Sequence, residues 1–508
     1  MLLATRKMIS DIDEYAERSL HINGQSLMYN AGKSAADKIK KLLRENARVC
    51  ILCGGGKNGG DGYVIASELF DSDHYVTVFE SESDRRDEST EYFRTRLLKK
   101  LKNIYSIKDL QKLSGACEGA ELIIDALFGV GFHGELPRPE AEAVKLANES
   151  HAMRVSVDIP SGIEADSGKV SSVCFDADHT MTMEYVKRGM LFYPARENVG
   201  RIHICSIGVE RSAVESRFRF LDRTVDNDLI RKYILSRPAD THKGTYGKLM
   251  LICGSPLMTG AAVLACEGAL RMGVGLCELV CTERVAEVVS VKCPEVIFRI
   301  VPPIEEWDNS VYEKLLLESV DADAIVVGCG LTAHKNVRKF IELISSLVGC
   351  PLLIDADGLN SLDGDTTLLE NAKREIIITP HPKEFARLVY RDIEGVVRDR
   401  YNSACELSDK CGITVLLKGA ATVIASPDGT RFINTTGNTG LAKGGSGDVL
   451  SGMIGALLAQ GIPSSLSAAL GAHVHGAAAD LLRGELGEVG MLPRELPSAA
   501  ARYIASLY

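Results

Sequence analysis

Residues 49–63 read Val-Cys-Ile-Leu-Cys-Gly-Gly-Gly-Lys-Asn-Gly-Gly-Asp-Gly-Tyr. The apolar run Val49–Cys53 predicts a buried strand, and the glycine-rich stretch 54–62 predicts a turn into a helix that begins at about Tyr63. A strand, a glycine turn and a helix form the repeating unit of proteins with a parallel sheet. This stretch therefore predicts an α/β fold.

The same unit recurs along the chain in two series. The first series, at about residues 1–215, has strands predicted at Val49–Cys53, Tyr75–Phe79, Leu122–Asp125, Val155–Asp158 and Arg201–Ile204. The second series follows a polar stretch at 210–240, with strands predicted at Lys248–Cys253, Leu276–Cys281, Ala324–Val327, Leu352–Asp355, Glu375–Thr379 and Thr414–Lys418. Continuous apolar strands fit parallel sheets that helices cover on both faces. We therefore predict two α/β domains, at 1–215 and 225–508.

Composition excludes several classes of protein. The 508 residues are 45% hydrophobic and 25% charged, which is typical of a globular chain of more than one domain. The formal net charge of −10 argues against a nucleic-acid partner, and no apolar run is long enough to cross a bilayer. Charged residues precede any apolar run at the start, so no signal peptide is predicted. We expect a cytoplasmic homo-oligomer with no nucleic-acid or membrane partner.

The 14 cysteines are scattered along the chain. Cys50-x-x-Cys53 has the spacing of a redox pair, but residues three apart on a strand point to opposite faces of the sheet. We interpret these cysteines as buried thiols rather than as a redox or zinc site.

The first glycine-rich stretch resembles a dinucleotide fingerprint only in part. Gly54, Gly56 and Gly59 have the spacing of that fingerprint, and Glu80 stands where a ribose-binding acid is expected. Asp61 argues against it, because a carboxylate in the turn competes with a pyrophosphate for the amides of the helix N-terminus. A Rossmann cofactor site remains the alternative interpretation.

Polar residues gather at the strand ends, where ligands bind in parallel α/β folds. Asn58, Asp125 and Ser161 offer oxygen ligands from three strand ends, and such ligands suit a hard cation. The glycine-rich turn at 129–135 offers backbone donors to phosphates. A single Asp at a strand end also commonly caps a helix, so both interpretations of Asp125 stay open.

Residues 436–448 read Thr-Gly-Asn-Thr-Gly-Leu-Ala-Lys-Gly-Gly-Ser-Gly-Asp, with a helix predicted from Val449. Glycines at a helix start leave several amides free to bind an anion. Asp448 stands beside these amides, where a base is needed to deprotonate a hydroxyl that attacks a phosphoryl group. A helix cap alone does not need four small residues before it, so we interpret Asp448 as catalytic.

Three other features of the second half are less specific. Lys418-Gly419-Ala420-Ala421-Thr422 ends a strand in a small turn that fits either a nucleotide phosphate or a plain hairpin. His381 stands between two prolines at a strand end, and functional and structural interpretations are equally open. His473 and His475 are two apart on a helical pattern and cannot share a face, so we interpret them as structural.

The first 215 residues resemble the NAD(P)H-hydrate epimerase family. The resemblance rests on Gly-Gly-Lys-Asn-Gly-Gly-Asp-Gly, on Asp125 with Gly-Val-Gly-Phe-His-Gly-Glu at 129–135, on Val-Asp-Ile-Pro-Ser-Gly at 157–162, and on Leu27-Met28 with Ala31-Gly32. It implies a Rossmann-like three-layer αβα domain and a potassium ion held by Asn58, Asp125 and Ser161. Asp158 is the implied catalytic residue. The implied substrate contacts are Lys57, Asn58, Gly59, Gly60, Asp61, Gly129, Val130, Gly131, Phe132, His133, Gly134, Glu135 and Asp158. Lys57 is a departure, because the family usually has Asn there.

The second half resembles the NAD(P)H-hydrate dehydratase family, which has a ribokinase-like αβα fold. The resemblance rests on an ordered set of motifs: Lys243-Gly244, Gly254-Ser255, Thr259-Gly260-Ala261, Gly328-Cys329-Gly330-Leu331, Asp355-Ala356-Asp357, 379–384, Lys418-Gly419 and Gly-Ser-Gly-Asp. It implies nucleotide contacts at Lys418, Gly419, Ala420, Ala421, Thr422 and Gly447. It implies hydrate contacts at Ala261, Gly330, His381 and the catalytic Asp448. The family commonly has Pro at the position of Cys329.

Together the two resemblances imply repair of hydrated NADH and NADPH. Hydration of the nicotinamide ring gives R and S epimers, the dehydratase accepts only the S epimer, and an epimerase makes both repairable. The implied dehydration uses ADP with Mg²⁺ and gives AMP and phosphate; ADP is expected because the fused arrangement resembles microbial members of the family. Two alternatives remain: a ribokinase-like kinase of a small vitamin precursor fused to a dinucleotide-binding domain, and a nucleotide sensor without catalytic activity.

Overall fold

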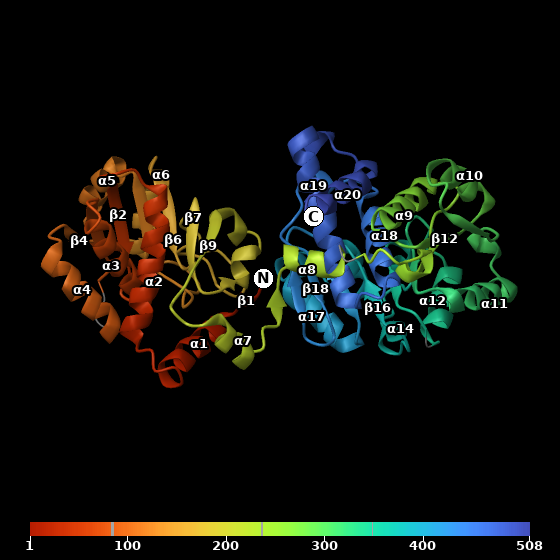
Figure 1. Cartoon of the computed structure of the whole chain (residues 1–508), viewed down its shortest axis with the longest axis horizontal. Coiled ribbons are helices and arrows are strands. Elements are labelled where there is room, and N and C mark those ends of the chain that lie inside the picture. Colours follow the sequence, from red (N-terminus) through yellow and green to blue (C-terminus); the bar gives the residue numbers. More distant parts are fainter. Residues whose placement is uncertain (83–85, 235–236, 348) are drawn as a thin grey trace. The chain divides into compact units, whose positions relative to one another are not determined.

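The computed structural model describes residues 1–82, 86–234, 237–347 and 349–508. The chain divides into two compact units, Leu2–Asp222 and Arg223–Tyr508 with Met1 (Figure 1). The division therefore falls within the interval 215–225 that separates the two series of strands in the sequence. In the described residues, no helix combines the length and the apolar character needed to cross a membrane.

The first unit is built on one parallel sheet with the strand order β4-β3-β2-β5-β6-β7-β9. Its strands are β2 (Arg48–Cys53), β3 (Tyr75–Glu80), β4 (Ile104–Ser106), β5 (Leu122–Ala126), β6 (Met153–Val157), β7 (His179–Met183) and β9 (Arg201–Cys205). A separate short pair joins β1 (Leu3–Ala4) to β8 (Val186–Lys187). The sequence did not predict β4, β7 or the short pair, because these segments carry no continuous apolar run.

Helices cover both faces of this sheet (Figure 1). They are α1 (Arg6–Arg18), α2 (Gly24–Ile39), α3 (Lys57–Phe70), α4 (Glu88–Lys100), α5 (Leu110–Gly119), α6 (Arg138–Glu149) and α7 (Arg211–Arg217). Ile51 and Cys53 of β2 belong to the core beneath α2 and α3, whereas Cys50 and Leu52 belong to the core beneath α5 and α6. Cys50 and Cys53 therefore point to opposite faces of the sheet, as predicted, and do not form a redox pair.

The second unit has a sheet in which β17-β16-β15-β14-β11-β12-β13 are parallel neighbours. These strands are β11 (Lys248–Ile252), β12 (Leu276–Cys281), β13 (Ile297–Ile300), β14 (Ala324–Val327), β15 (Leu352–Ile354), β16 (Ile376–Ile378) and β17 (Thr414–Leu417). β18 (Val423–Ala425) and β19 (Arg431–Ile433) extend the sheet in antiparallel fashion. The sequence predicted neither of these two strands; the connections that join them have only a few residues, which permit hairpins and no crossover helix. β10 (Asp222–Arg223) spans the division between the units.

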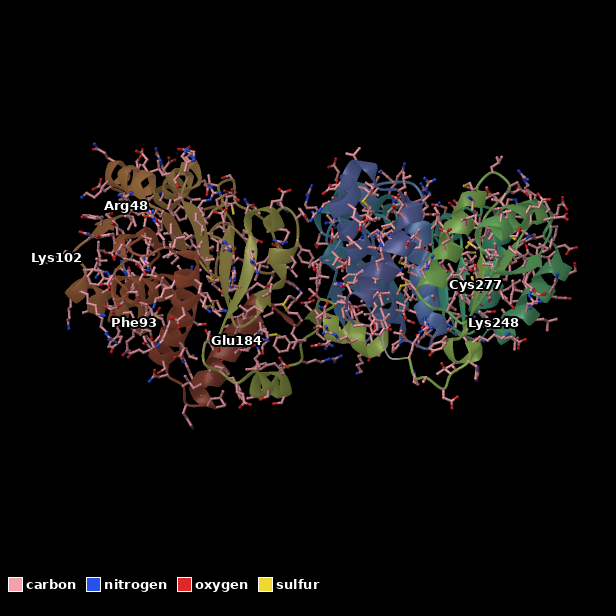
Figure 2. All side chains as sticks on the ribbon, turned by 45° about the horizontal axis from the view of Figure 1, so that its top comes forward. Arg48, Phe93, Lys102, Glu184, Lys248 and Cys277 are labelled. Carbon is pink, nitrogen blue, oxygen red and sulfur yellow. The ribbon has the colours of Figure 1, made fainter. Side chains whose placement is uncertain are left out.

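The helices of the second unit also lie on both sides of its sheet (Figure 1). They are α8 (Asn227–Tyr233), α9 (Thr259–Arg271), α10 (Glu283–Lys292), α11 (Asn309–Glu318), α12 (Lys335–Ser345), α13 (Asp357–Asn360), α14 (Thr367–Glu370), α15 (Pro382–Leu388), α16 (Ile393–Arg398), α17 (Arg400–Cys411), α18 (Ser446–Ala459), α19 (Ser464–Gly490) and α20 (Leu496–Ala505). Leu249 and Leu251 pack with α9, α18 and α19, and the alternate residues Met250 and Ile252 are also buried. Figure 2 shows Cys277, a buried residue of β12, inside this unit.

Strand register brings the predicted site residues to one edge of each sheet. In the first unit, Cys53 is in register with Ala126, and Asp125 with Ser156. In the second unit, Ile252, Val327, Ile354 and Ile378 are in register across neighbouring strands, so the residues that follow them lie at a common edge. The predicted motifs at 125–135 and 158–161, and those at 328–330, 355–357 and 379–384, thus lie at the carboxyl ends of their strands.

Two helices begin earlier than the sequence predicted. α3 begins at Lys57 rather than at Tyr63, and α18 begins at Ser446 rather than at Val449. The glycines that suggested a longer turn are instead required for close packing: a Cβ atom at Gly59 would lie 1.9 Å from the carbonyl oxygen of Gly54. Asp61 and Asp448 therefore lie on helices rather than in the turns before them.

Candidate functional sites

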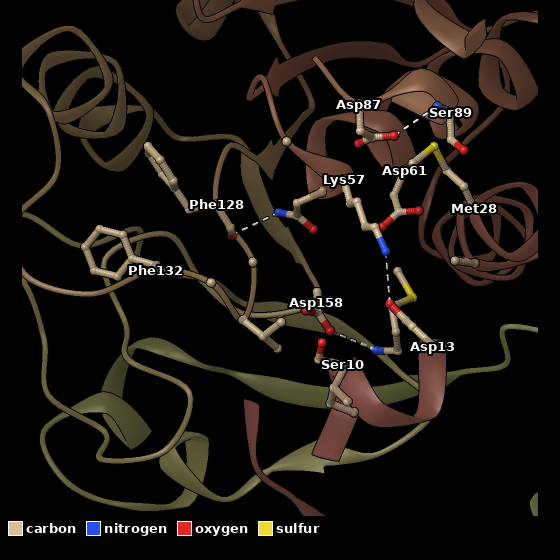
Figure 3. Close-up of a pocket in the computed structure, with 18 of the residues that line it drawn as sticks. Ser10, Asp13, Met28, Lys57, Asp61, Asp87, Ser89, Phe128, Phe132 and Asp158 are labelled. Carbon is tan, nitrogen blue, oxygen red and sulfur yellow. Dashed lines mark hydrogen bonds and ion pairs between the residues drawn. The ribbon is translucent and has the colours of Figure 1, made fainter. Parts of the chain in front are cut away.

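A cavity of about 980 Å³ lies at the strand ends of the first unit (Figure 3). It is lined by ten of the predicted substrate contacts: Lys57, Asn58, Asp61, Gly129, Val130, Gly131, Phe132, His133, Glu135 and Asp158. Gly59, Gly60 and Gly134 do not line it. At Gly59 and Gly60 a side chain would collide with the Gly54 carbonyl and with the Met28 sulfur, so these two glycines serve the packing of α3.

Among the carboxylates that line this cavity, Asp13, Asp61 and Asp158 lie close to one lysine, Lys57 (Figure 3). The Lys57 Nζ atom lies 3.3 Å from Asp13 Oδ2, which comes from α1. Burial raises the pKa of Asp61 well above its ordinary value, and the nearby charges of Asp158 and Asp13 add to the effect. Burial also raises the pKa of Asp13, with Lys57 acting in the opposite direction. The cavity therefore holds a carboxyl group, Asp61, that favours its protonated form.

Asp158 has a strained backbone conformation, and its side chain pairs with a buried lysine. Its φ is +66°, in the left-handed region that residues with a side chain seldom adopt. Oδ1 forms an ion pair with Lys187 and accepts a hydrogen bond from the Met183 amide at 3.2 Å. A Cβ atom at Gly129 would lie 3.3 Å from Oδ2, so this second oxygen faces the turn that begins at 129. Asp158 thus presents one carboxylate oxygen to the cavity while the other is fixed.

Asn58, Asp125 and Ser161 are brought together through the backbone of Phe128. Asn58 Nδ2 donates to the Phe128 carbonyl at 2.9 Å, and the Phe128 amide donates to Ser161 Oγ at 3.0 Å. Ser161 in turn donates to Asp125 Oδ1 from its hydroxyl at 2.6 Å and to Oδ2 from its amide at 2.8 Å. The cluster is therefore continuous and built mainly of oxygen atoms.

One oxygen of this cluster, Asn58 Oδ1, is buried and has no hydrogen-bond partner within the described residues. Burial raises the pKa of Asp125 to about 6, although its hydrogen bonds from Ser161 and Leu127 act in the opposite direction. An unsatisfied buried oxygen beside a desolvated carboxylate fits a cation that satisfies the first and neutralises the second. Asp125 is not a simple helix cap, because its carboxylate joins two strand ends.

Glu80 does not face the cavity. Its carboxylate accepts hydrogen bonds from Arg94 Nη2 at 2.7 Å, Arg94 Nε at 2.8 Å and the Tyr63 hydroxyl at 2.9 Å. A ribose-binding acid has to be free to accept from the sugar hydroxyls. This occupied carboxylate weakens the Rossmann cofactor interpretation of the glycine-rich stretch.

The turn at 129–135 offers backbone donors to the cavity. Within the described residues, the amides of Gly129, Val130 and Gly131 have no hydrogen-bond acceptor, whereas the Phe132 amide donates to the Gly129 carbonyl at 3.1 Å. Glu135 steadies the end of the turn by accepting from the amide and hydroxyl of Ser172, at 2.8 and 2.6 Å. Such free consecutive amides suit an anionic group.

The second unit gathers Asp448, Asp355 and Lys418 at the ends of three elements. Lys418 Nζ lies 2.7 Å from Asp355 Oδ1, and Ser451 of α18 donates to Asp355 Oδ2 at 2.6 Å. Burial raises the pKa of Asp448 to about 6, and the negative charge of Asp355 adds to the effect. Burial lowers the pKa of Lys418, but Asp355 and Glu384 outweigh it and raise that pKa overall. The pKa of the Asp448 carboxyl group therefore lies close to neutral pH, and the group is beside the charged Lys418 ammonium.

Backbone amides without an acceptor among the described residues precede Asp448 at the start of α18. Gly445 caps the helix with φ +103°, and the amides of Gly444, Gly445 and Gly447 have no acceptor among the described residues. A Cβ atom at Gly447 would lie 3.3 Å from Lys418 Nζ, so the glycine leaves room in front of that ammonium. Free amides and a lysine converge beside the carboxylate, an arrangement that suits transfer of a phosphoryl group.

Other predicted contacts of the second unit lie near this cluster. Gly330 has φ +61°, and a Cβ atom there would lie 2.5 Å from the Ala261 methyl group, so the two residues are in contact. The thiol of Cys329, the residue before Gly330, lies 3.9 Å from Asp355 Oδ2.

The histidines divide into two groups. His381 caps α15: its Nδ1 accepts from the amides of Lys383 and Glu384 at 3.1 and 3.3 Å, and its imidazole remains half exposed. The pKa of the buried His473 and His475 falls to about 4 by desolvation, so both are neutral. His473 contacts the Tyr503 hydroxyl at 3.0 Å. His381 thus has a structural role as the cap of α15. The exposed edge of its imidazole is still accessible to a ligand.

The segment 418–422 joins two antiparallel strands, β17 and β18. It is a hairpin, which is the simpler of the two interpretations, and Lys418 at its start contacts Asp355 in the cluster beside Asp448. The two interpretations of this segment are therefore compatible.

Sequence reasoning assigned no role to four residues that complete these sites: Asp13, Lys187, Asp355 and Ser451. Asp355 had a signal, because it follows a predicted strand directly. Lys187 had none, since it stands in a two-residue strand and becomes significant only through its contact with Asp158.

Known proteins match both halves of the chain. A family model described as NAD(P)H-hydrate dehydratase matches residues 249–502, and a model described as YjeF-related protein N-terminus matches residues 24–189. The chain is 34% identical to the bifunctional NAD(P)H-hydrate repair enzyme of Moorella thermoacetica, over 98% of this chain and 95% of that protein. It is 33% identical to the enzyme of the same name from Escherichia coli, over 94% of this chain and 89% of that protein.

A solved structure resembles the second unit. It is the ADP/ATP-dependent NAD(P)H-hydrate dehydratase of Bacillus subtilis, co-crystallised with ATP and Mg²⁺, with a TM-score of 0.51 and 31% identity over 56% of this chain and 98% of that chain. The predicted α/β class, with a ribokinase-like second half, is confirmed by this likeness and by the sheets described above. The chain therefore belongs to the family of bifunctional NAD(P)H-hydrate repair enzymes.

Proposed function

We propose that the chain restores hydrated NADH and NADPH in two steps. The first domain, at about 1–215, epimerises the R and S hydrates, and the second, at about 225–508, dehydrates the S hydrate at the expense of ADP. The observation that carries this proposal is the presence of two separate sites of different chemistry. One is a cavity lined by carboxylates, and the other is a set of free amides beside Asp448 and Lys418.

In the first domain, Asp158 and Asp61 would act as base and acid. The hydrate carries its hydroxyl on a carbon bonded to the ring nitrogen. Removal of the hydroxyl proton by Asp158, with protonation of the nitrogen by Asp61, breaks that carbon–nitrogen bond and leaves an aldehyde. Rotation of the aldehyde and closure from its other face, with both protons returned, gives the opposite epimer. Lys187 forms an ion pair with Asp158, and burial raises the pKa of Asp61, which favours its protonated form.

The cluster around Asp125 would hold a potassium ion through Asn58, Asp125 and Ser161. The unpartnered Asn58 Oδ1 and the buried Asp125 carboxylate support this part of the proposal. The ion would supply positive charge next to the turn at 129–135, where the free amides would bind the phosphates of the substrate. The other substrate contacts are those predicted from the sequence at 57–61 and 129–135, with Asp158.

In the second domain, Asp448 would take the proton of the ring hydroxyl as that oxygen attacks the terminal phosphate of ADP. The free amides of Gly444, Gly445 and Gly447 and the Lys418 ammonium would stabilise the negative charge that moves with the phosphoryl group. This transfer breaks the bond between the terminal phosphate and AMP, so AMP leaves in the same step. The phosphorylated intermediate then loses phosphate and a ring proton, which restores the double bond. Removal of one preorganised donor of this kind costs about 3–4 kcal/mol in the transition state.

The nucleotide would bind at Lys418, Gly419, Ala420, Ala421, Thr422 and Gly447, and the hydrate at Ala261, Gly330, His381 and Asp448. Mg²⁺ would accompany the phosphates, as it accompanies ATP in the crystals of the Bacillus subtilis dehydratase. We choose ADP over ATP because the fused arrangement resembles microbial members of the family. A cytoplasmic location, a homo-oligomeric state and the lack of a nucleic-acid partner remain predictions.

A single assay tests this function. The purified chain is incubated with mixed NADH hydrate epimers and Mg²⁺, with ADP or with ATP, and the return of NADH absorbance is followed. Complete recovery with ADP, with AMP and phosphate as products, supports both steps. A stable phosphorylated product without NADH would instead identify a kinase, and binding without turnover would identify a sensor.

A further inference from the structure

A guanidinium group lies directly against the proposed nucleotide turn. Arg400 is the first residue of α17, and its Nη2 donates to the Ala420 carbonyl at 2.6 Å. A Cβ atom at Gly419 would lie 2.6 Å from Arg400 Nη1, so the guanidinium rests on the backbone of the turn. Arg400 therefore contacts two of the five residues at 418–422 without being near them in sequence.

This guanidinium has no counter-charge in the described part of the chain. No ion pair joins Arg400 to a carboxylate, although Arg391 pairs with Glu406 at 2.7 Å and Arg431 pairs with Asp409 at 2.8 Å. Burial lowers the pKa of Arg400, and no charged neighbour contributes to the shift. Removing a cation from water without a compensating anion is unfavourable. A bound ligand can therefore supply the negative charge that the described residues do not place beside Arg400.

The turn beside it is also prepared for an anion. The amides of Ala420 and Ala421 have no acceptor among the described residues, and Ala421 has φ +56°. Consecutive free amides next to a left-handed residue form a concave site that favours phosphate oxygens. An arginine adds a planar pair of donors to such a site and binds phosphate in two parallel hydrogen bonds.

We propose that Arg400 binds a phosphate group of the nucleotide, together with the free amides of the turn at 418–422. The proposal rests on the nucleotide role of that turn and adds a residue from a separate helix. Arg400 would set affinity for the phosphate part of ADP, and it would have no contact with the hydrate. Its bond to the Ala420 carbonyl uses one donor, and the remaining donors of the guanidinium are left for the phosphate.

Equilibrium binding of ADP, AMP and adenosine to the full chain and to Arg400→Met tests this role. A lost hydrogen bond between charged groups weakens binding by about 10- to 100-fold, so we expect that loss for ADP and no change beyond about twofold for adenosine. The Michaelis constant for the hydrate should not change. Arg391→Met, which removes an exposed arginine already paired with Glu406, is the matched control and should bind ADP normally.

Two results of this binding experiment would overturn the proposal. Unchanged ADP affinity in Arg400→Met overturns the proposal. Equal losses for ADP and adenosine also overturn it, because a residue that only shapes the turn does not distinguish a phosphate from a nucleoside.

A second measurement needs no variant. The wild-type chain is treated with phenylglyoxal, and modification of the Arg400 peptide is measured by mass spectrometry. ADP should protect Arg400 and adenosine should not; equal modification with and without ADP contradicts the proposal. Failure of the proposed function gives a different pattern, in which ADP binds and protects Arg400 but hydrate is not converted to NADH.

Discussion

Lys187 and Asp158 form a buried ion pair at the edge of the first cavity. Lys187 is 0% exposed, and its two other protons are donated to Thr182 Oγ1 and the Met183 carbonyl, each at 3.0 Å. All three protons of the ammonium are thus engaged. Asp158 is fixed through one oxygen, and its other oxygen remains available to the substrate.

Lys187→Met should abolish epimerisation, because it leaves the Asp158 carboxylate buried without its partner. The same change should reduce stability by about 3–5 kcal/mol, the usual cost of breaking a buried ion pair. The measurements are the rate of epimer exchange and chemical denaturation of the first domain. Lys187→Arg keeps the charge and should recover part of the stability. Full epimerase activity in Lys187→Met would remove Lys187 from the mechanism.

Asp61→Asn should lose epimerase activity and gain stability at neutral pH. Because the pKa of Asp61 is raised in the folded protein, the folded state binds the proton more tightly than the unfolded state. Stability is therefore lost as pH rises from the unfolded pKa of about 3.9 towards the raised folded value. Denaturant midpoints of Asp61→Asn and wild type should coincide near that unfolded pKa and diverge at higher pH. A variant less stable than wild type at neutral pH contradicts this assignment.

Asp448→Asn should lower the rate of dehydration by about 100- to 10,000-fold while ADP still binds. In the wild type, kcat/KM should rise with pH through about 6, because the raised pKa of Asp448 keeps the base protonated below that value. The measurements are NADH recovery from the S hydrate across pH and calorimetric binding of ADP. Near-normal turnover in the variant would show that another group is the base.

Asp125→Ala separates the cation site from a helix cap. Asp125 carries the only full negative charge among the three proposed ligands, so epimerisation should fall sharply while dehydration by the second domain continues. NADH recovery from mixed epimers under excess ADP should then have two phases, a fast one from the S hydrate and a slow one from uncatalysed exchange. If Asp125 were only a cap, the change would cost about 1 kcal/mol of stability and recovery would stay complete and fast.

The two units should be separable. A fragment of residues 1–222 should fold and epimerise, because its sheet, core and cavity lie within Leu2–Asp222. Circular dichroism and epimer exchange check this expectation. An insoluble N-terminal fragment beside a soluble C-terminal one would place the boundary elsewhere.

Much of both sites was predictable because the signals are local. A strand followed by glycines and a helix forces the chain to turn at the sheet edge, so Asp125, Asp158 and Asp448 were placed by their neighbours in sequence. The start of α3 was not predictable in the same way. Glycines disfavour helices in general, and only the contact of Gly59 with Gly54 explains their presence in this one.

Local sequence patterns were enough to predict the α/β class, the two series of strands and the strand ends at which the candidate sites lie, since these depend on apolar runs and glycine turns within a few residues. The partners became visible only in the folded chain: Lys187 for Asp158, Asp355 for Lys418 and Arg400 for the turn at 418–422. Strand order and register bring these residues together from positions 29, 63 and 20 residues apart in the chain. No local pattern encodes such contacts, because the attraction that offsets the cost of burying a charge arises only when the folded chain brings its partner within a few ångströms.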